Sequence, residues 1–183
     1  MTTVYFVRHA QSDRGVHDEQ TRPLTRKGFA DTLEITKFFK GKNISKIFSS
    51  PMQRAIDTVS DFAKHARLEI QLVDDFKERR KDKWSEGHLE IIQKSWEDFS
   101  LEIDGESLNE VQARNIAALK KVLAGNRGGN IVIGTHGTAL STILNYYDES
   151  FGLEQWKVMP MPWICRIDFD ENGSYIGWTG TPE

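Results

Sequence analysis

Cysteine and long apolar runs are scarce in this chain of 183 residues, and each scarcity excludes a class of protein. The single cysteine, Cys165, excludes a disulfide within the chain, and its apolar surroundings predict a buried side chain without a redox role. No apolar run approaches the roughly 20 residues of a membrane span, so we expect no membrane partner. The start MTTVYFVRHA lacks the basic segment and the long apolar core of a secretion signal. We therefore expect a cytoplasmic protein.

A surplus of one sign of charge is also missing. The 24 Lys and Arg residues against 27 Asp and Glu residues give a formal net charge of −3. A general surface for polyanions is therefore not expected, and nucleic acid is not a predicted partner, although a local basic pocket is compatible with this charge. The hydrophobic share of 38% and the charged share of 28% are typical of a globular protein that buries a core. Because the sequence has no linker-like, low-complexity or repeated segment, we expect residues 1–183 to form a single domain.

Strand-like and helix-like segments alternate along the chain. Runs rich in β-branched and aromatic residues predict strands at 3–8, 45–49, 68–73 and 130–135, and a closing hairpin at 163–179. Apolar residues at helical spacing predict helices at about 26–40, 51–66, 108–124 and 138–147. The stretch 74–100 is expected to be a loop with irregular helix over the ends of the sheet. This alternation predicts the α/β class, with a mostly parallel central sheet, an antiparallel edge and helices on both faces.

Two local signals mark the starts of helices. Ser50-Pro51 has the form of an N-cap followed by proline at the first helical position. Ser107-Leu108-Asn109-Glu110 has the form of a capping box, in which the serine and the glutamate each satisfy a backbone N–H group of the other. Both signals predict that a helix begins within one or two residues.

Two of the predicted strands end in a histidine. The strand at 3–8 delivers Arg8-His9, and the strand at 130–135 delivers His136-Gly137. In open α/β sheets, ligands bind just outside the carboxyl ends of the strands. Arg8 offers a planar fork of donors that matches phosphate or carboxylate oxygens, and Gly137 allows the backbone to approach a ligand where a helix begins. The two sites together predict a pocket for an anion and for nucleophilic or acid–base chemistry.

Two further residues are candidates because of their setting. Arg54 follows a strand, two serines and a proline, which places it at the carboxyl edge beside a helix amino end that favours anions. Taken alone, it would be a solvated helix residue. Glu78 lies in the charged run 76–83, which by composition is a solvated face. Its alternative meaning is a carboxyl group held close to several cations.

Five short motifs occur in order along the chain, and together they resemble the histidine phosphatase superfamily, also called the phosphoglycerate mutase-like family. The resemblance covers residue 4 to about residue 140. The motifs are Val7-Arg8-His9-Ala10, Pro23-Leu24-Thr25-x-x-Gly28, Ser49-Ser50-Pro51-x-x-Arg54-Ala55-x-x-Thr58, Gly105-Glu106-Ser107 and Thr135-His136-Gly137.

The resemblance implies a role for each candidate residue. His9 would be the nucleophile, and Glu78 would be the proton donor. Arg8, Arg54 and His136, with Gly137, would bind the phosphoryl group, so that the catalytic set is His9, Glu78 and His136. His136 would be most useful when protonated. No cofactor is implied, and the sequence contains no cluster with the spacing of metal ligands.

The chain also departs from the family pattern. Ala10 replaces a usual glycine, and Gly15 stands where many members have an asparagine that contacts phosphate. The segment from Ala10 to Arg22 is short, as in the small phosphohistidine phosphatases. Residues 83–87, Lys-Trp-Ser-Glu-Gly, are only a loose echo of the Gly-x-Trp-Glu-Gly sequence that is common near the proton donor.

The implied function is that of a metal-independent, histidine acid-type phosphatase that hydrolyses phosphomonoesters through a phosphohistidine on His9. Three alternatives remain open: a phosphoglycerate mutase, a phosphohistidine or phosphoprotein phosphatase, and a non-catalytic module that binds a phosphorylated ligand. The partner would be a small phosphorylated metabolite or a phosphoprotein. Met159-Pro160-Met161-Pro162 is a candidate rim loop. The natural substrate, the oligomeric state and the role of the basic run at 77–83 do not follow from the sequence.

Overall fold

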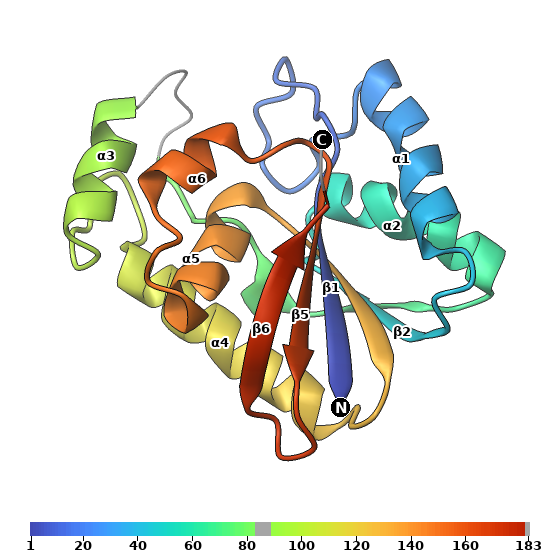
Figure 1. Ribbon diagram of the computed structural model, residues 1–183. Coiled ribbons are helices and arrows are strands. Elements are labelled where there is room, and N and C mark those ends of the chain that lie inside the picture. The colour runs from blue at the N-terminus through green and yellow to red at the C-terminus, as the bar shows by residue number, and fades with distance from the viewer. Residues whose placement is uncertain (83–88, 182–183) are drawn as a thin grey trace.

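The computed structural model describes residues 1–82 and 89–181 (Figure 1). The predicted strands and helices are all present, in the order that the sequence predicts. The strands are β1 (Thr2–Arg8), β2 (Ile44–Ser49), β3 (Ile70–Leu72), β4 (Asn130–Thr135), β5 (Trp163–Phe169) and β6 (Tyr175–Gly180). The helices are α1 (Arg26–Phe39), α2 (Gln53–Ala66), α3 (Leu89–Glu97), α4 (Leu108–Ala124), α5 (Gly137–Tyr147) and α6 (Leu153–Val158), with a 3₁₀ turn at Asp74–Phe76.

The six strands form one sheet in the order β3-β2-β4-β1-β5-β6. The pairs β3–β2, β2–β4 and β4–β1 are parallel, whereas β5 runs antiparallel to β1 and β6 runs antiparallel to β5. The predicted fold class, a mostly parallel sheet with an antiparallel edge, is confirmed. The carboxyl ends of β1, β2 and β4 meet at one edge, which lies at the top of the sheet in Figure 1.

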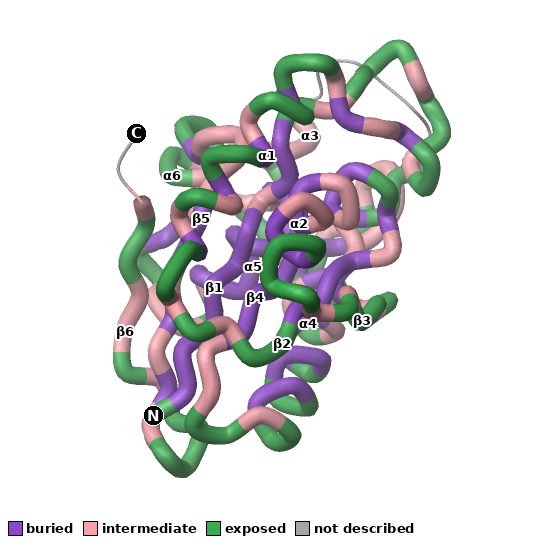
Figure 2. The backbone as a smooth tube through the Cα atoms, turned by 90° about the vertical axis from the view of Figure 1, so that its right-hand side faces the viewer, coloured by how far each residue is buried: buried purple, intermediate pink, exposed green. Residues whose placement is uncertain are grey.

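Alternate residues of the central strands face two separate cores. Val4 and Phe6 of β1 pack with α4 and α5, whereas Tyr5 and Val7 pack with α1 and α2. Both faces of β1 and β4 are therefore covered, and Figure 2 shows the two strands buried in the middle of the molecule. This burial explains why their sequences are continuous apolar runs rather than alternating ones. No helix in the described part of the chain is long and apolar enough to cross a bilayer.

Two elements have other ends than the sequence predicts, and one helix was not predicted. Strand β3 has three residues instead of six, because Leu68 donates its N–H to the carbonyl of Ala63 (3.0 Å) and Arg67 ends α2 in a left-handed conformation. Helix α2 begins at Gln53 rather than at Pro51. The short helix α6 was not predicted. By contrast, the capping box at the start of α4 is confirmed, with both of its hydrogen bonds present.

Candidate active site

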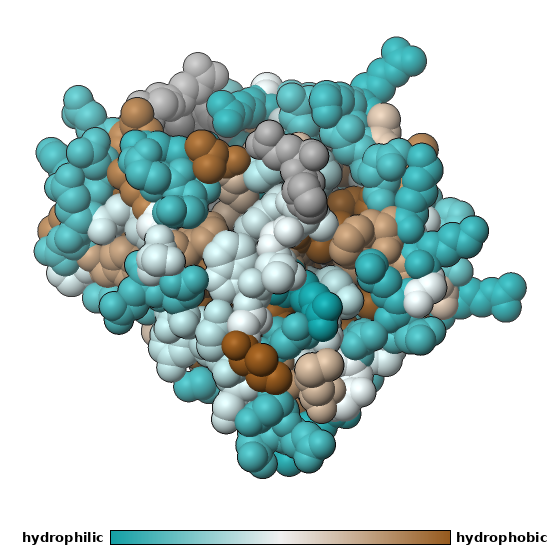
Figure 3. Space-filling model, viewed as in Figure 1, coloured by the Kyte–Doolittle hydropathy of each residue, from teal (hydrophilic) through white to brown (hydrophobic). Residues whose placement is uncertain are grey.

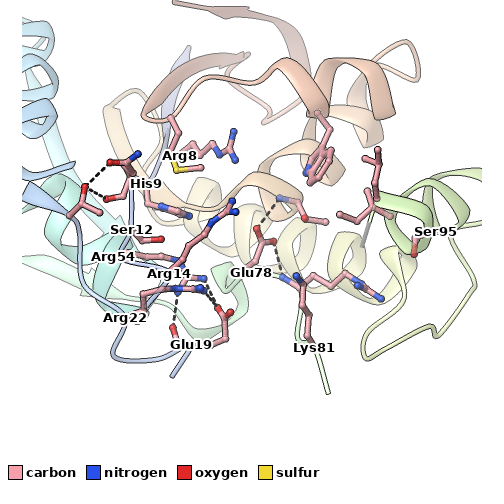
Figure 4. A pocket seen from close by; sticks show the side chains of 18 of the residues that line it. Arg8, His9, Ser12, Arg14, Glu19, Arg22, Arg54, Glu78, Lys81 and Ser95 are labelled. Atoms are coloured by element: carbon pink, nitrogen blue, oxygen red, sulfur yellow. Dashed lines mark hydrogen bonds and ion pairs between the residues drawn. The ribbon is translucent and has the colours of Figure 1, made fainter. Parts of the chain in front are cut away.

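A cleft of about 820 Å³ opens at the carboxyl edge of the sheet (Figure 4). Its walls come from the segment after β1, the start of α2, the segment after β3, the start of α5, and helices α3 and α6. Arg8, His9, Arg54 and Glu78 all line it. His136 is fully buried, and the centre of its ring lies 5.3 Å from the centre of the His9 ring. Residues from position 8 to position 136 therefore converge as expected.

The backbone around His9 is fixed by bonds to two other elements. The N–H of His9 donates to the carbonyl of Thr135 (3.0 Å) at the end of β4. The N–H of Ala10 donates to the hydroxyl of Thr58 on α2 (2.9 Å), and the same hydroxyl donates to the carbonyl of Arg54 (2.7 Å). Ala10 is fully buried in this turn, so the methyl group that replaces the usual glycine is accommodated.

The His9 ring is held as a neutral imidazole with a defined tautomer. Its Nδ1 lies 2.7 Å from the carbonyl oxygen of Ala10, which can only accept, so Nδ1 carries the proton and Nε2 keeps a lone pair. Burial, reinforced by the positive charge of Arg54, lowers the pKa of His9 to about 3. The ring is therefore uncharged at neutral pH, with its one proton on Nδ1. Its Nε2 is available as a nucleophile without a separate base.

Arg8 is anchored by neutral oxygen atoms. Its Nη1 donates to the carbonyls of Met159 and Pro160, in the loop that the sequence suggested as a rim. Its Nε is buried and has no hydrogen-bond partner in the described part of the chain. A Cβ atom at Gly137 would lie 3.2 Å from Nη2 of Arg8, so a larger residue there would press on the guanidinium. Gly137 is thus needed for the close approach of Arg8 to the start of α5.

Arg54 is almost fully buried, with 2% of its surface exposed, so the solvated alternative is excluded. Its Nη1 donates to the carbonyl of Glu19 (2.7 Å), and its Nη2 pairs with the Glu19 carboxylate (2.9 Å). Arg22 pairs with the same carboxylate at 2.5 Å. The sequence analysis missed Glu19 and Arg22, although Arg22 directly precedes the Pro-Leu-Thr-x-x-Gly motif. Arg22 also acts on the ring of His9, whose pKa it helps to lower.

His136 is oriented by Ser50. The Nε2 of the ring lies 2.8 Å from the hydroxyl oxygen of Ser50, which also accepts the N–H of Met52 (3.2 Å). Helix α2 begins at Gln53 with Met52 as its N-cap residue, so the prediction that Ser50 caps this helix is wrong. Burial and the charge of Arg54 lower the pKa of His136 well below its usual value, so the ring is neutral, whereas the resemblance implied that a protonated ring is the more useful form. Its Nδ1 is buried without a partner among the described residues.

Glu78 lies at the amino end of α5, directly beside His136-Gly137. Its carboxylate accepts the N–H groups of Thr138 and Ala139 (3.1 Å each) and of its own neighbour Arg79 (2.8 Å). Unsatisfied N–H groups and the helix dipole favour an acidic group at this position. The sequence suggested only a carboxyl group near cations. The structure places that group inside the cleft with His9 and Arg8.

The segment that carries Glu78 is held from behind by Arg114 of α4. Arg114 donates from Nη1 to the carbonyls of Asp75 and Lys77 (2.8 Å each) and from Nη2 to the carbonyl of Glu78 (3.0 Å). Its remaining donors pair with the Glu106 carboxylate at 2.8 and 2.9 Å. The glutamate of the Gly-Glu-Ser motif, Glu106, therefore has a structural role. It holds Arg114, and Arg114 holds the main chain of the Glu78 segment.

Several other sequence expectations concern the surroundings of the cleft. Trp96 and Trp156 line it, and Trp163 and Trp178 pack against the core. Cys165 is buried, and burial raises the pKa of its thiol, in keeping with an unreactive side chain.

The partial match to Gly-x-Trp-Glu-Gly at residues 83–87 lies outside the described residues. Among residues 1–82 and 89–181, no group of three or more His, Cys, Asp or Glu side chains is placed to hold a metal ion.

The sheet order and the cleft correspond to the phosphoglycerate mutase-like fold, which solved structures of low sequence identity share. "Bacillus stearothermophilus YhfR" has a TM-score of 0.79 at 23% identity, with 96% of this chain and 95% of that chain covered. A phosphoserine phosphatase from Entamoeba histolytica has a TM-score of 0.78 at 21% identity, with 97% and 96% covered. A mycobacterial glucosyl-3-phosphoglycerate phosphatase has a TM-score of 0.76 at 17% identity, with 97% and 96% covered.

The family follows from the sequence itself. The model of the histidine phosphatase superfamily, branch 1, matches residues 4–179, and the chain belongs to this superfamily. Among curated relatives, the "Probable phosphoglycerate mutase GpmB" of Shigella dysenteriae serotype 1 is 24% identical over 190 residues, covering 94% of this chain and 87% of the relative. The protein of the same name from Citrobacter koseri has the same identity and coverage. The resemblance stated from the motifs is thereby confirmed.

Proposed function

We propose that this protein is a phosphatase that hydrolyses phosphomonoesters through a phosphohistidine formed on Nε2 of His9, without a metal ion. The observation that carries the proposal is the state of His9. Its pKa, lowered to about 3, keeps the ring neutral, and the bond from Nδ1 to the Ala10 carbonyl directs the free lone pair to Nε2. A nucleophile that is already deprotonated needs no base to activate it.

The groups around His9 suit a phosphoryl dianion. Phosphoryl transfer mainly requires positioning and stabilisation of negative charge on the equatorial oxygens. Arg8 and Arg54 would bind those oxygens, with Arg22 adding positive charge to the same region. The partnerless Nδ1 of His136 and Nε of Arg8 are buried polar atoms that oxygen atoms of the phosphoryl group would satisfy.

Glu78 would move the proton in both steps. In the first step Nε2 of His9 forms a bond to phosphorus, the ester P–O bond breaks, and the proton of Glu78 passes to the leaving oxygen. In the second step the Glu78 carboxylate takes a proton from water, whose oxygen attacks phosphorus as the N–P bond breaks. Inorganic phosphate and free His9 result.

The substrate class that we propose is a small phosphorylated metabolite. Two related structures are of a phosphoserine phosphatase with bound phosphoserine and with bound 3-phosphoglyceric acid. A phosphoglycerate mutase is the second candidate, because curated relatives carry that name. The remaining alternatives are a phosphohistidine or phosphoprotein phosphatase and a non-catalytic module that binds a phosphorylated ligand. We also propose that residues 1–183 form one catalytic domain in the cytoplasm, with no nucleic-acid or membrane partner.

Hydrolysis of p-nitrophenyl phosphate in the presence of EDTA tests the proposal. We expect turnover in EDTA, a radiolabelled phosphoryl group on His9 after acid-free quenching, and loss of both in His9→Ala with an unchanged circular dichroism spectrum. A His9→Ala variant that hydrolyses at the wild-type rate would contradict the mechanism. Conversion of 3-phosphoglycerate to 2-phosphoglycerate faster than release of inorganic phosphate, followed by NMR, would replace the phosphatase by the mutase.

A further inference from the structure

The cleft carries more positive charge than one phosphoryl group neutralises. Among its described lining residues, seven side chains are cationic and two carry carboxyl groups. A phosphoryl dianion offsets two charges, so a surplus remains when it is bound. The cationic residues are Arg8, Arg14, Arg22, Lys27, Arg54, Arg79 and Lys81, and the acidic residues are Glu19 and Glu78.

Most of these cations already have partners within the protein. Arg22 and Arg54 share the Glu19 carboxylate, and Arg8 donates to two carbonyls as described above. Lys27 pairs with Asp31 at 2.6 Å. Arg79 donates to the carbonyls of Ile103 and Glu106 behind the cleft. The side chains of Arg14 and Lys81, in contrast, make no hydrogen bond or ion pair with any residue in the described ranges.

Arg14 is the better placed of the two. It lies in the segment between β1 and α1, and in Figure 4 its side chain extends from that segment into the cavity. Burial lowers the pKa of Arg8, and the positive charge of Arg14 lowers it further. The charge of Arg14 therefore reaches the cleft, where an anion would offset it. Its fork of donors also binds carboxylates and phosphates in two-point contacts, which the ammonium group of Lys81 does not.

The cleft also has apolar lining residues. Ile92 and Trp96 of α3, Trp156 of α6 and Met161 line it, and none of these residues can contact a phosphoryl group through a charge. Trp96 and Trp156 are both only half-buried. Figure 3 shows hydrophobic side chains at the surface near α3 and α6 among hydrophilic neighbours. Apolar walls of this kind hold the carbon skeleton of a ligand, while a few charged groups fix its orientation.

We propose that the substrate is a phosphomonoester whose organic part is apolar and carries a second anionic group, which binds Arg14. This inference rests on the proposed function, because the phosphoryl group must occupy the end of the cleft at His9, Arg8 and Arg54. The second anion then lies next to Arg14, and the apolar part packs on the wall formed by Trp96 and Trp156. A carboxylate and a second phosphate share the chemistry that Arg14 recognises.

Four aryl phosphates test the proposal. Phenyl phosphate is the parent compound, and 4-carboxyphenyl phosphate adds a negative charge. The third, 4-carbamoylphenyl phosphate, has nearly the same shape as the carboxylate without its charge, and 1,4-phenylene bisphosphate supplies a second phosphate. The kcat and KM of each are measured for the wild type, Arg14→Ala, Arg14→Lys and Lys81→Ala. Arg127→Ala is the control, because it removes an exposed arginine before β4, at the end of the sheet away from the cleft.

We expect the wild type to prefer the carboxylate or the bisphosphate over the neutral amide. Arg14→Ala should reduce this preference about tenfold, as expected for one hydrogen-bonded charge pair, and mainly through KM. Arg14→Lys should restore part of it, and Arg127→Ala should not change it. The anionic substrate that depends more strongly on Arg14 identifies the second group as carboxylate or phosphate.

Two results would overturn the inference and leave the proposed function intact. One is equal turnover of the anionic and neutral substrates by the wild type. The other is a preference that Arg14→Ala leaves unchanged while Lys81→Ala abolishes it, because the second anion would then bind Lys81 and not Arg14. A wild-type protein that hydrolyses none of the four compounds contradicts the proposed function itself, and the inference falls with it.

Discussion

Arg114 and Glu78 are 36 positions apart in the sequence, yet Nη2 of Arg114 donates to the main-chain carbonyl of Glu78 at 3.0 Å. Arg114 binds the main chain of Glu78 and not its carboxylate. Two more carbonyls of the same segment accept from Arg114, and Glu106 holds the guanidinium in place. Arg114 is therefore a positioning residue for the proposed proton donor.

Replacement of Arg114 should slow reactions that depend on a proton donor. We expect Arg114→Gln to lower kcat about 10- to 100-fold for an alkyl phosphate and much less for p-nitrophenyl phosphate, because misplacement of a reacting group by about 1 Å costs up to roughly 100-fold. The readout is the dependence of kcat on the pKa of the leaving group. Arg166→Gln removes another arginine–carboxylate pair, with Asp168 on β5, and serves as the control. A uniform loss for all leaving groups would indicate a merely structural role.

Glu78 itself can be tested by its isosteric amide. Glu78→Gln keeps the shape of the side chain but cannot donate and recover a proton. The expected loss in kcat is roughly 10²- to 10⁴-fold, and it is greatest for poor leaving groups. Steady-state kinetics with ethyl phosphate and p-nitrophenyl phosphate measure it. An unchanged rate on ethyl phosphate would remove Glu78 from the mechanism.

The two buried histidines should make folding stability depend on pH. Because burial lowers the pKa of His9 to about 3 and that of His136 well below its usual value, the unfolded chain binds protons that the native protein does not. Stability should therefore be complete above pH 7 and fall as the pH drops below about 6.5. For His9 the pKa of about 3 corresponds to a loss of about 2 kcal/mol between pH 7 and pH 5, and His136 adds to it in the same direction.

Urea unfolding in phosphate-free buffer measures the effect. His9→Asn should make the free energy of unfolding less sensitive to pH between 7 and 5. His65→Asn replaces a histidine whose side chain is 67% exposed and should leave the sensitivity unchanged. If His9→Asn keeps the full slope, the ring of His9 is not neutral in the native state.

Gly28 lies so close to the backbone of Gln11, a residue that lines the cleft, that we expect any side chain at position 28 to be destabilising. A Cβ atom at this position would lie 2.2 Å from the carbonyl oxygen of Gln11, whereas one at Gly177 on β6 would meet nothing within 4 Å. Gly28→Ala should therefore destabilise the fold by about 1–3 kcal/mol, as overpacking usually does. Gly177→Ala should cost well below that. Thermal or urea unfolding of the two variants compares them, and equal midpoints would refute the contact.

The sequence predicted the centre of the site because the sheet itself brings it together. Arg8-His9 and His136-Gly137 end two buried strands, and parallel strands place their carboxyl ends side by side. The apolar runs of β1 and β4 and the capping box at Ser107 are local signals strong enough to be read one segment at a time. The same holds for the order of strands and helices.

The supporting contacts could not be predicted, since they join segments that meet only in the folded chain. Glu19 and Arg22 lie in a polar stretch whose composition is that of an ordinary surface loop, and nothing there marks Arg54 as their partner. The contacts of Arg114 with main-chain carbonyls leave no trace in the sequence around Glu78. The contact of Ser50 with His136 also joins two distant segments, and the local sequence predicted only a helix cap at this serine.

One hydroxyl group, that of Thr58, ties the backbone of the proposed nucleophile to the helix that supplies Arg54. A shift of α2 relative to the sheet would therefore move the turn after His9 together with Arg54. The main chain at the proposed nucleophile and the helix that supplies the phosphate-binding arginine are therefore held together by a single side chain.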